Sequence, residues 1–171
     1  VEGRTLIGVL NSIGVLRDAE AVPMLVTKCK SGEQDVAAAA IAALGEIGND
    51  GAAAALRAGL TAQVDAETRG EFALAAVVCA ERLFRENDSA AATDLYQQVR
   101  AADVSKQRQL EATRGLLVIN EEKSVTLLTE CLNSSDEDLF RLGLKMARTL
   151  PGDEVSVVLS QAIRSAAPEL S

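Results

Sequence analysis

The chain has 171 residues, of which 48% are apolar, 25% charged and only 2% aromatic, and its formal net charge is -8. It contains no histidine, which excludes Ser-His-Asp and Cys-His catalytic pairs and histidine-based zinc sites. The negative charge repels phosphate backbones and no basic stripe offsets it, so we expect no nucleic-acid binding. No apolar stretch approaches the roughly 20 residues that span a bilayer, so we also expect no membrane insertion.

A helical period of 3.6 residues runs along the whole chain, and no segment alternates with the period of a strand. The pattern predicts an all-α chain of about five antiparallel helix pairs, separated by turns rich in Gly, Asn, Asp and Ser. The first helices of the pairs are predicted at 2–16, 34–47, 66–85, 105–119 and 137–150. The second helices are predicted at 20–30, 52–60, 90–101, 123–133 and 154–165.

Internal repetition supports this pairing. Residues 10–14 (LNSIG) return at 44–48 (LGEIG), an offset of 34, and residues 25–31 match 127–133 at an offset of 102, which is three times 34. Each pair has a thin apolar layer that only stacking on its neighbours can bury. We therefore expect one repeat domain over 1–171, a piece of a longer chain, with approximate repeats 1–33, 34–64, 65–103, 104–135 and 136–171.

The segments 21–25 (AVPML), 29–36 (CKSGEQDV) and 39–48 (AAIAALGEIG) resemble short bacterial HEAT repeats of the armadillo-type solenoid class. The resemblance implies a right-handed α-α superhelix and a stacking mode, but no activity, because HEAT arrays share no common chemistry.

Four positions bear on how such repeats stack. Ala37 stands where the family usually has an arginine, and Arg69, Arg108 and Arg141 look like the retained versions. In the family that arginine, with a neighbouring aspartate, forms a ladder between repeats, so the resemblance puts the rung at Ala37 in doubt.

One alternative to HEAT packing stays open in the middle of the chain. Residues 80–84 (AERLF) to 92–96 (ATDLY) resemble a tetratricopeptide unit, and the two kinds of packing around 80–102 differ in curvature and in the face that binds a partner.

Side chains capable of chemistry have simpler interpretations. Cys29, Cys79 and Cys131 lack metal-ligand spacing and are expected to be small buried core residues. The acidic clusters at 121–122 and 136–138 stand at predicted helix starts, where carboxylates cap free N–H groups. Asn87 and Asn133 match the N-glycosylation pattern, but both lie in predicted turns where Asn is expected anyway. We expect no catalytic residue, cofactor or metal.

A partner surface is expected on the wall formed by the second helices, which solenoids often present to other molecules. In the predicted register this wall carries few charges and offers Arg57, Tyr96, Arg100 and Arg164 as anchors of the kinds enriched at interfaces. Tyr96 has a second interpretation, as a ring packed between repeats.

The sequence thus favours a non-enzymatic scaffold or spacer module of a larger bacterial protein, monomeric in isolation, with an unidentified protein partner and a cytoplasmic location slightly favoured. The alternative is an accessory domain to a lyase-type or sugar-acting catalytic domain elsewhere in the parent chain or in a partner. Nucleic-acid binding of the kind seen in HEAT-like DNA glycosylases is disfavoured by the charge.

Overall fold

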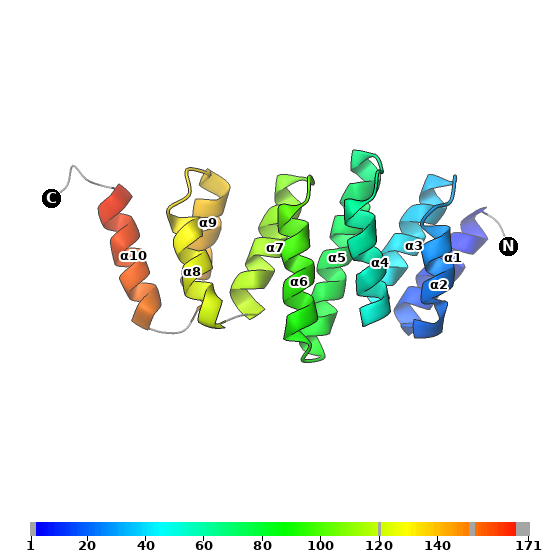
Figure 1. Cartoon of the computed structure of the whole chain (residues 1–171), viewed down its shortest axis with the longest axis horizontal. Helices are drawn as coiled ribbons and strands as arrows, with labels where there is room; N and C mark the ends of the chain where they lie inside the picture. Colours follow the sequence, from blue (N-terminus) through cyan, green and yellow to red (C-terminus); the bar gives the residue numbers. More distant parts are fainter. Residues whose placement is uncertain (1–2, 120, 151–152, 167–171) are drawn as a thin grey trace. The chain divides into compact units, whose positions relative to one another are not determined.

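The computed structural model describes residues 3–119, 121–150 and 153–166, and gives no side-chain placement for 121–123, 153 and 163–166. The described residues form helices and turns, with no strand among them (Figure 1). The helices are α1 (Gly3–Leu16), η1 (Ala19–Ala21), α2 (Val22–Lys28), α3 (Gln34–Ile47), α4 (Asp50–Thr61), α5 (Ala66–Arg85), α6 (Ser89–Ala101), α7 (Lys106–Ile119), α8 (Glu121–Leu132), α9 (Glu137–Met146) and α10 (Asp153–Ala166). The predicted all-α solenoid class is confirmed.

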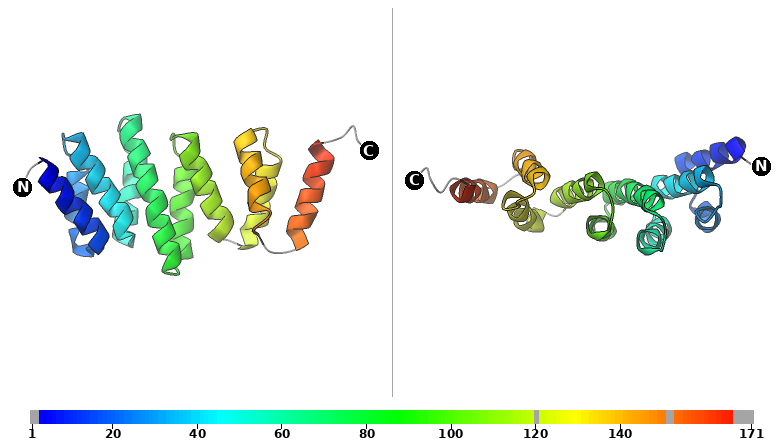
Figure 2. Two further views of the ribbon diagram at one scale, coloured as in Figure 1. Left: turned by 180° about the vertical axis from the view of Figure 1, so that it is seen from behind. Right: turned by 90° about the horizontal axis from the view of Figure 1, so that it is seen from above.

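The contacts divide the chain into two compact units, residues 1–112 and 113–171. In the first unit α1, α3 and α5 pack side by side, and α2, α4 and α6 form a second layer against them (Figure 2). In the second unit α8 contacts both α9 and α10. Within each unit these helices pack on helices near them in sequence, as expected for stacked helix pairs.

Helix α3 is the centre of the first unit. It contacts α1 and α5 on its two sides and α2 and α4 on a third, so nine of its fourteen residues are buried. Four of these nine are alanines and one is glycine, and their small side chains let the neighbouring helices approach closely. At Gly45 the backbones of α3 and α5 lie close together, because a Cβ there would lie 2.7 Å from the carbonyl oxygen of Ala75 on α5.

The C-terminal ends of α1, α3 and α5 share a left-handed backbone conformation. The residue that follows the last turn has a positive φ: 56° at Arg17, 63° at Gly48 and 66° at Asn87. Glycine adopts this left-handed conformation freely, whereas Arg and Asn do so at a cost of about 1 kcal/mol. These positions are 31 and 39 residues apart (48 − 17 and 87 − 48).

The 34-residue offset is therefore wrong as a structural register for the first two repeats. The resembling segments 10–14 and 44–48 do not superpose in the fold, because α1 and α3 end 31 residues apart (47 − 16). Gly14 corresponds to Gly45 instead, and a Cβ at Gly14 would lie 2.9 Å from the Cα of Ala43, the same close helix approach. The predicted helix ranges do not depend on that offset: 34–47 and 66–85 agree with α3 and α5.

Two predicted helices are shorter than expected. The range 20–30 divides into η1 and α2, with Pro23 in the first turn of α2, where its missing N–H is not needed. The range 137–150 ends at Met146, because Leu150 precedes Pro151 and a residue before proline disfavours the helical conformation.

Side chains seal the C-terminal end of α3. Arg17 donates from Nε and Nη2 to the carbonyl oxygen of Ile47, at 3.2 and 3.1 Å, which satisfies one of the free carbonyls of the last turn. Arg17 also pairs with Glu86, and Arg82 pairs with Glu46. These ion pairs join the first three helix pairs at one end of the helices, which we call the sealed end.

Candidate functional site

The predicted anchors on the second helices are placed as follows. Arg57 lies on α4, where its Nη1 is 2.7 Å from Oδ2 of Asp94 on α6. Tyr96, on α6, is 3% exposed, so its ring packs in the core as in the second interpretation. Arg100, in the last turn of α6, is half-buried, and the side chain of Arg164 lies outside the described residues. Partner binding by the three arginines stays a prediction.

The arginines expected to form a ladder behave differently from one another. Arg69 donates from Nη2 to the carbonyl oxygen of Val64 at 3.1 Å and lies 3.7 Å from Asp103. Arg108 and Arg141 instead pair with Glu111 and Glu137, on their own helices. The expected ladder is therefore wrong for these last two, because a carboxylate one helical turn away captures each guanidinium.

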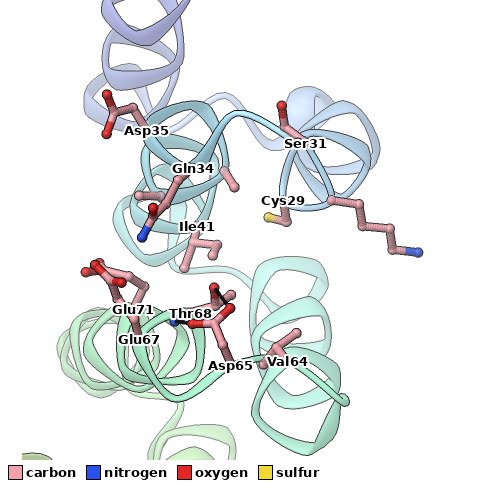
Figure 3. Close-up of a pocket in the computed structure, with 14 residues that line it drawn as sticks. Cys29, Ser31, Gln34, Asp35, Ile41, Val64, Asp65, Glu67, Thr68 and Glu71 are labelled. Atoms are coloured by element: carbon pink, nitrogen blue, oxygen red, sulfur yellow. Dashed lines mark hydrogen bonds between the residues drawn. The ribbon is translucent and has the colours of Figure 1, made fainter.

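The opposite end of α3 from the sealed end is hollowed. A groove of about 660 Å³ opens between the start of α3, the start of α5 and the loop after α2 (Figure 3). Asp65, Glu67 and Glu71 stand along its α5 side, and Gln34 and Ile41 face them from α3. We call this hollow the acidic groove.

The reason for the opening is the side chain at the fourth position of each helix. In α5 that residue is Arg69, which reaches back to the carbonyl of Val64 in the preceding turn. In α7 it is Gln109, whose Nε2 donates to the carbonyl oxygen of Ala102 at 3.1 Å. In α3 it is Ala37, which is too short to reach back and lines the acidic groove instead.

The carboxylates of the acidic groove are poorly neutralised. Glu67 and Glu71 lie one turn apart on α5, where two like charges repel. No ion pair to either of them, or to Asp35 and Asp65, occurs among the described residues. Lys30 is the one basic residue among the described residues that line the groove. The groove therefore carries a local excess of negative charge.

Asp65 also has a structural task. It is the N-cap of α5, and its carboxylate accepts hydrogen bonds from the backbone N–H of Thr68 at 2.9 Å and from the Thr68 hydroxyl at 2.8 Å. These bonds hold the pKa of the Asp65 carboxyl below its ordinary value of 3.8, so the group stays charged at neutral pH. Its exposed side chain keeps that charge at the mouth of the groove.

A second hollow of about 510 Å³ lies next to the acidic groove, between α2 and α4. It is lined mainly by apolar and small side chains, among them Val26, Leu44, Ala55, Ala58 and Phe72. The two hollows share Cys29, Lys30 and Val64, so they are neighbouring parts of one surface. We call the second hollow the apolar recess.

The cysteines are free thiols in the structure. Cys79 and Cys131 are buried, at 0% and 2% exposure, which confirms the expectation of small core residues for these two. Cys29 is half-buried where the two hollows meet. Burial raises the pKa of the Cys29 thiol to about 11 and that of Cys79 to about 12, so both are protonated and weakly nucleophilic at neutral pH.

The acidic cluster at 136–138 caps a helix, as predicted. Asp136 accepts hydrogen bonds from the N–H groups of Asp138 at 3.0 Å and Leu139 at 3.3 Å, at the start of α9. The side chains of the other cluster, 121–122, lie outside the described residues. Within the described part of the chain, no three side chains of metal-ligating type are grouped so that they could hold a metal ion.

Stacked helix pairs with small residues at the contacts define an α-helical repeat protein. Residues 4–76 match the family described as HEAT repeats, and this segment belongs to the HEAT-repeat family. The match ends before residues 80–102, so the tetratricopeptide alternative there stays a prediction. No curated protein matches the chain.

HEAT repeats generally mediate protein–protein interaction, and the family is typically non-catalytic. Over the part of the chain that was described, no helix has the length and apolar character needed to cross a membrane. No sequence pattern marks either hollow as a site, although Ala37, whose short side chain opens the acidic groove, stands out because an arginine is usual there.

Proposed function

We propose that the chain is a non-enzymatic scaffold module that holds a protein partner through the acidic groove and the apolar recess. The observation that carries the proposal is the adjacency of the two hollows around Cys29, Lys30 and Val64. Volumes of about 660 and 510 Å³ are of the size that receives side chains or small ligands. An apolar hollow beside charged groups combines a source of affinity with a source of orientation.

The helices around the hollows suit this role because they are rigidly packed. The acidic groove is lined by residues of α3 and α5, which pack closely at Gly45 and are joined by the ion pair between Arg82 and Glu46. A preformed surface does not have to be ordered on binding, which lowers the entropic cost of association. Such a surface is what a scaffold within a larger protein requires.

The proposal is tested by selection of a displayed random-peptide library against the purified 171-residue chain. We expect enrichment of peptides that share a motif and that lose binding to Ala37→Arg, which fills the acidic groove. The matched control is Ala42→Arg, which adds the same charge on the exposed side of α3 and does not line the groove. No enrichment, or enriched peptides that bind both variants alike, would contradict the proposal.

We propose the predicted anchors as a second candidate surface. Arg57 and Arg100 are partly exposed on α4 and α6, and arginine is enriched at interface hot spots. The double variant Arg57→Ala with Arg100→Ala, screened against the same peptides, distinguishes the surfaces. If the double variant loses peptide binding while Ala37→Arg keeps it, the partner surface lies on the second helices and not at the two hollows.

A further inference from the structure

We infer that the partner segment is basic, with lysine or arginine side chains beside a single large apolar side chain. This inference rests on the proposed function and names the chemistry that the two hollows recognise. The apolar side chain enters the apolar recess, and its basic neighbours lie along the carboxylates of the acidic groove.

The acidic groove is complementary in charge to a basic segment. Asp65, Glu67 and Glu71 line one side of the groove, and none of them is ion-paired within the described residues. Two like charges one turn apart cost helix stability, and a cation between them removes that cost. A basic segment therefore gains attraction to the groove and relieves repulsion within α5, whereas an acidic segment meets repulsion from every carboxylate.

The second step concerns the apolar recess. It lies between α2 and α4, and its wall is built from Val26, Ala55, Ala58, Gly59 and Phe72. Burying one Leu or Phe side chain there adds affinity that salt does not screen, whereas the attraction of basic residues weakens as the salt concentration rises. The apolar side chain supplies affinity and the basic side chains supply orientation. One short segment can use both hollows because they meet at Cys29 and Lys30.

The acidic groove is specific to the repeat that contains α3. Arg69 and Gln109 bond back to the preceding turn at the corresponding positions of α5 and α7. An arginine at position 37 would place a guanidinium among the carboxylates and occupy the groove from inside. Because Ala37 carries no charge, these carboxylates stay accessible to a basic side chain of a partner.

The test uses fluorescein-labelled synthetic peptides and anisotropy titrations of the complete chain at low salt and at about 150 mM salt. The probe is GKRLRKG, compared with GEDLDEG, in which the charges are reversed, and with GKRGRKG, which lacks the anchor. We expect the first peptide to bind at least about tenfold more tightly than either of the others. Its affinity should fall with salt but persist at about 150 mM, because the anchor is not screened.

Variants of the chain then locate the site. Ala37→Arg and the double variant Glu67→Gln with Glu71→Gln should each weaken the first peptide about tenfold. Ala42→Arg, which adds the same charge as Ala37→Arg, and Glu20→Gln, which neutralises one exposed carboxylate outside the groove, should stay within about twofold. Circular dichroism melts test whether each variant is folded.

The outcomes separate this inference from the proposed function. If GEDLDEG binds as well as GKRLRKG, or if GKRGRKG does, the basic-and-apolar chemistry is wrong. The library selection can still yield a motif that depends on position 37, and the proposed function then stands with a different partner chemistry. If no library peptide depends on position 37, the proposed function fails whatever the synthetic peptides do.

Discussion

The two ends of helix α3 differ in how the charged groups around them are paired. At its sealed end, Arg17 covers the carbonyl of Ile47 and Glu46 pairs with Arg82, so the charges of neighbouring repeats neutralise one another. At its other end, Ala37 makes no such contact and the nearby carboxylates stay without ion pairs in the described structure. One end neutralises its charges across the repeats, and the other leaves its carboxylates without ion pairs among the described residues.

The largest expected effect comes from separating the helices between the two ends. In Gly45→Ala the new Cβ would lie 2.7 Å from the carbonyl oxygen of Ala75, so α3 and α5 must move apart. Overpacking of this kind costs about 2 kcal/mol, which we expect as a lower free energy of unfolding in urea titrations. The control is Gly70→Ala on α5, where nothing lies within 4 Å of the added Cβ. Equal stability of the two variants would show that α3 and α5 are not in close contact.

A smaller loss is expected at the N-cap of α5, and it depends on pH. Because the folded pKa of Asp65 lies below its ordinary value of 3.8, the carboxylate contributes its full stability above that value. The contribution disappears as the pH falls through the folded pKa. Asp65→Ala should therefore lower the melting temperature at pH 7 by more than it does in acid below the folded pKa.

The matched variant for this prediction is Asp65→Asn, which keeps an N-cap acceptor without the titrating charge. It should melt between the native chain and Asp65→Ala at pH 7, because the acceptor stays and the charge is lost, and it should show a weaker dependence on acid. A constant difference between Asp65→Ala and the native chain from pH 7 to pH 2 would contradict the assigned cause.

Breaking an ion pair at the sealed end should cost less. Glu46 is 41% exposed and its partner Arg82 is 27% exposed, so solvent screens much of their attraction. We expect Glu46→Gln to destabilise the chain by about 0.5 kcal/mol in low-salt urea titrations. At about 1 M NaCl the difference should vanish. A loss that is unchanged by salt would mean that Glu46 acts through packing and not through charge.

The smallest effect has the opposite sign and belongs to the acidic groove. Glu71→Gln removes the like-charge repulsion with Glu67 and should stabilise the chain by about 0.2–0.5 kcal/mol at low salt. Glu20→Gln, an exposed change elsewhere in the same unit, should have no such effect. A loss of stability in Glu71→Gln would show that the glutamate already has a cationic partner in solution.

The sequence predicted the helices better than it predicted their contacts. The apolar period placed α3 and α5 because each buries a continuous stripe and begins and ends at polar or glycine residues. It gave the wrong register for the first two repeats, because the resemblance between 10–14 and 44–48 ignores Arg17, which ends α1 in a conformation that usually calls for glycine.

The candidate site was harder to predict for a physical reason. The residue type alone suggested Tyr96 as an anchor, because tyrosine is common at interfaces. The exposure of a side chain depends on which neighbours cover it, and the ring of Tyr96 lies in the core. The acidic groove arises from a short side chain at Ala37 and carboxylates some 30 residues away (67 − 37), so no local pattern marks it. Aligning Ala37 with Arg69 by their place in the helix was the available signal.

The difference between Ala37 and Arg69 has an evolutionary consequence. Both occupy the fourth position of a helix, where Ala37 lines the acidic groove and Arg69 bonds back to the preceding turn. An array of this kind can gain or lose a groove by the replacement of one side chain, without insertion of a loop. Duplicated repeats can therefore diverge in what they hold while they remain interchangeable as building blocks.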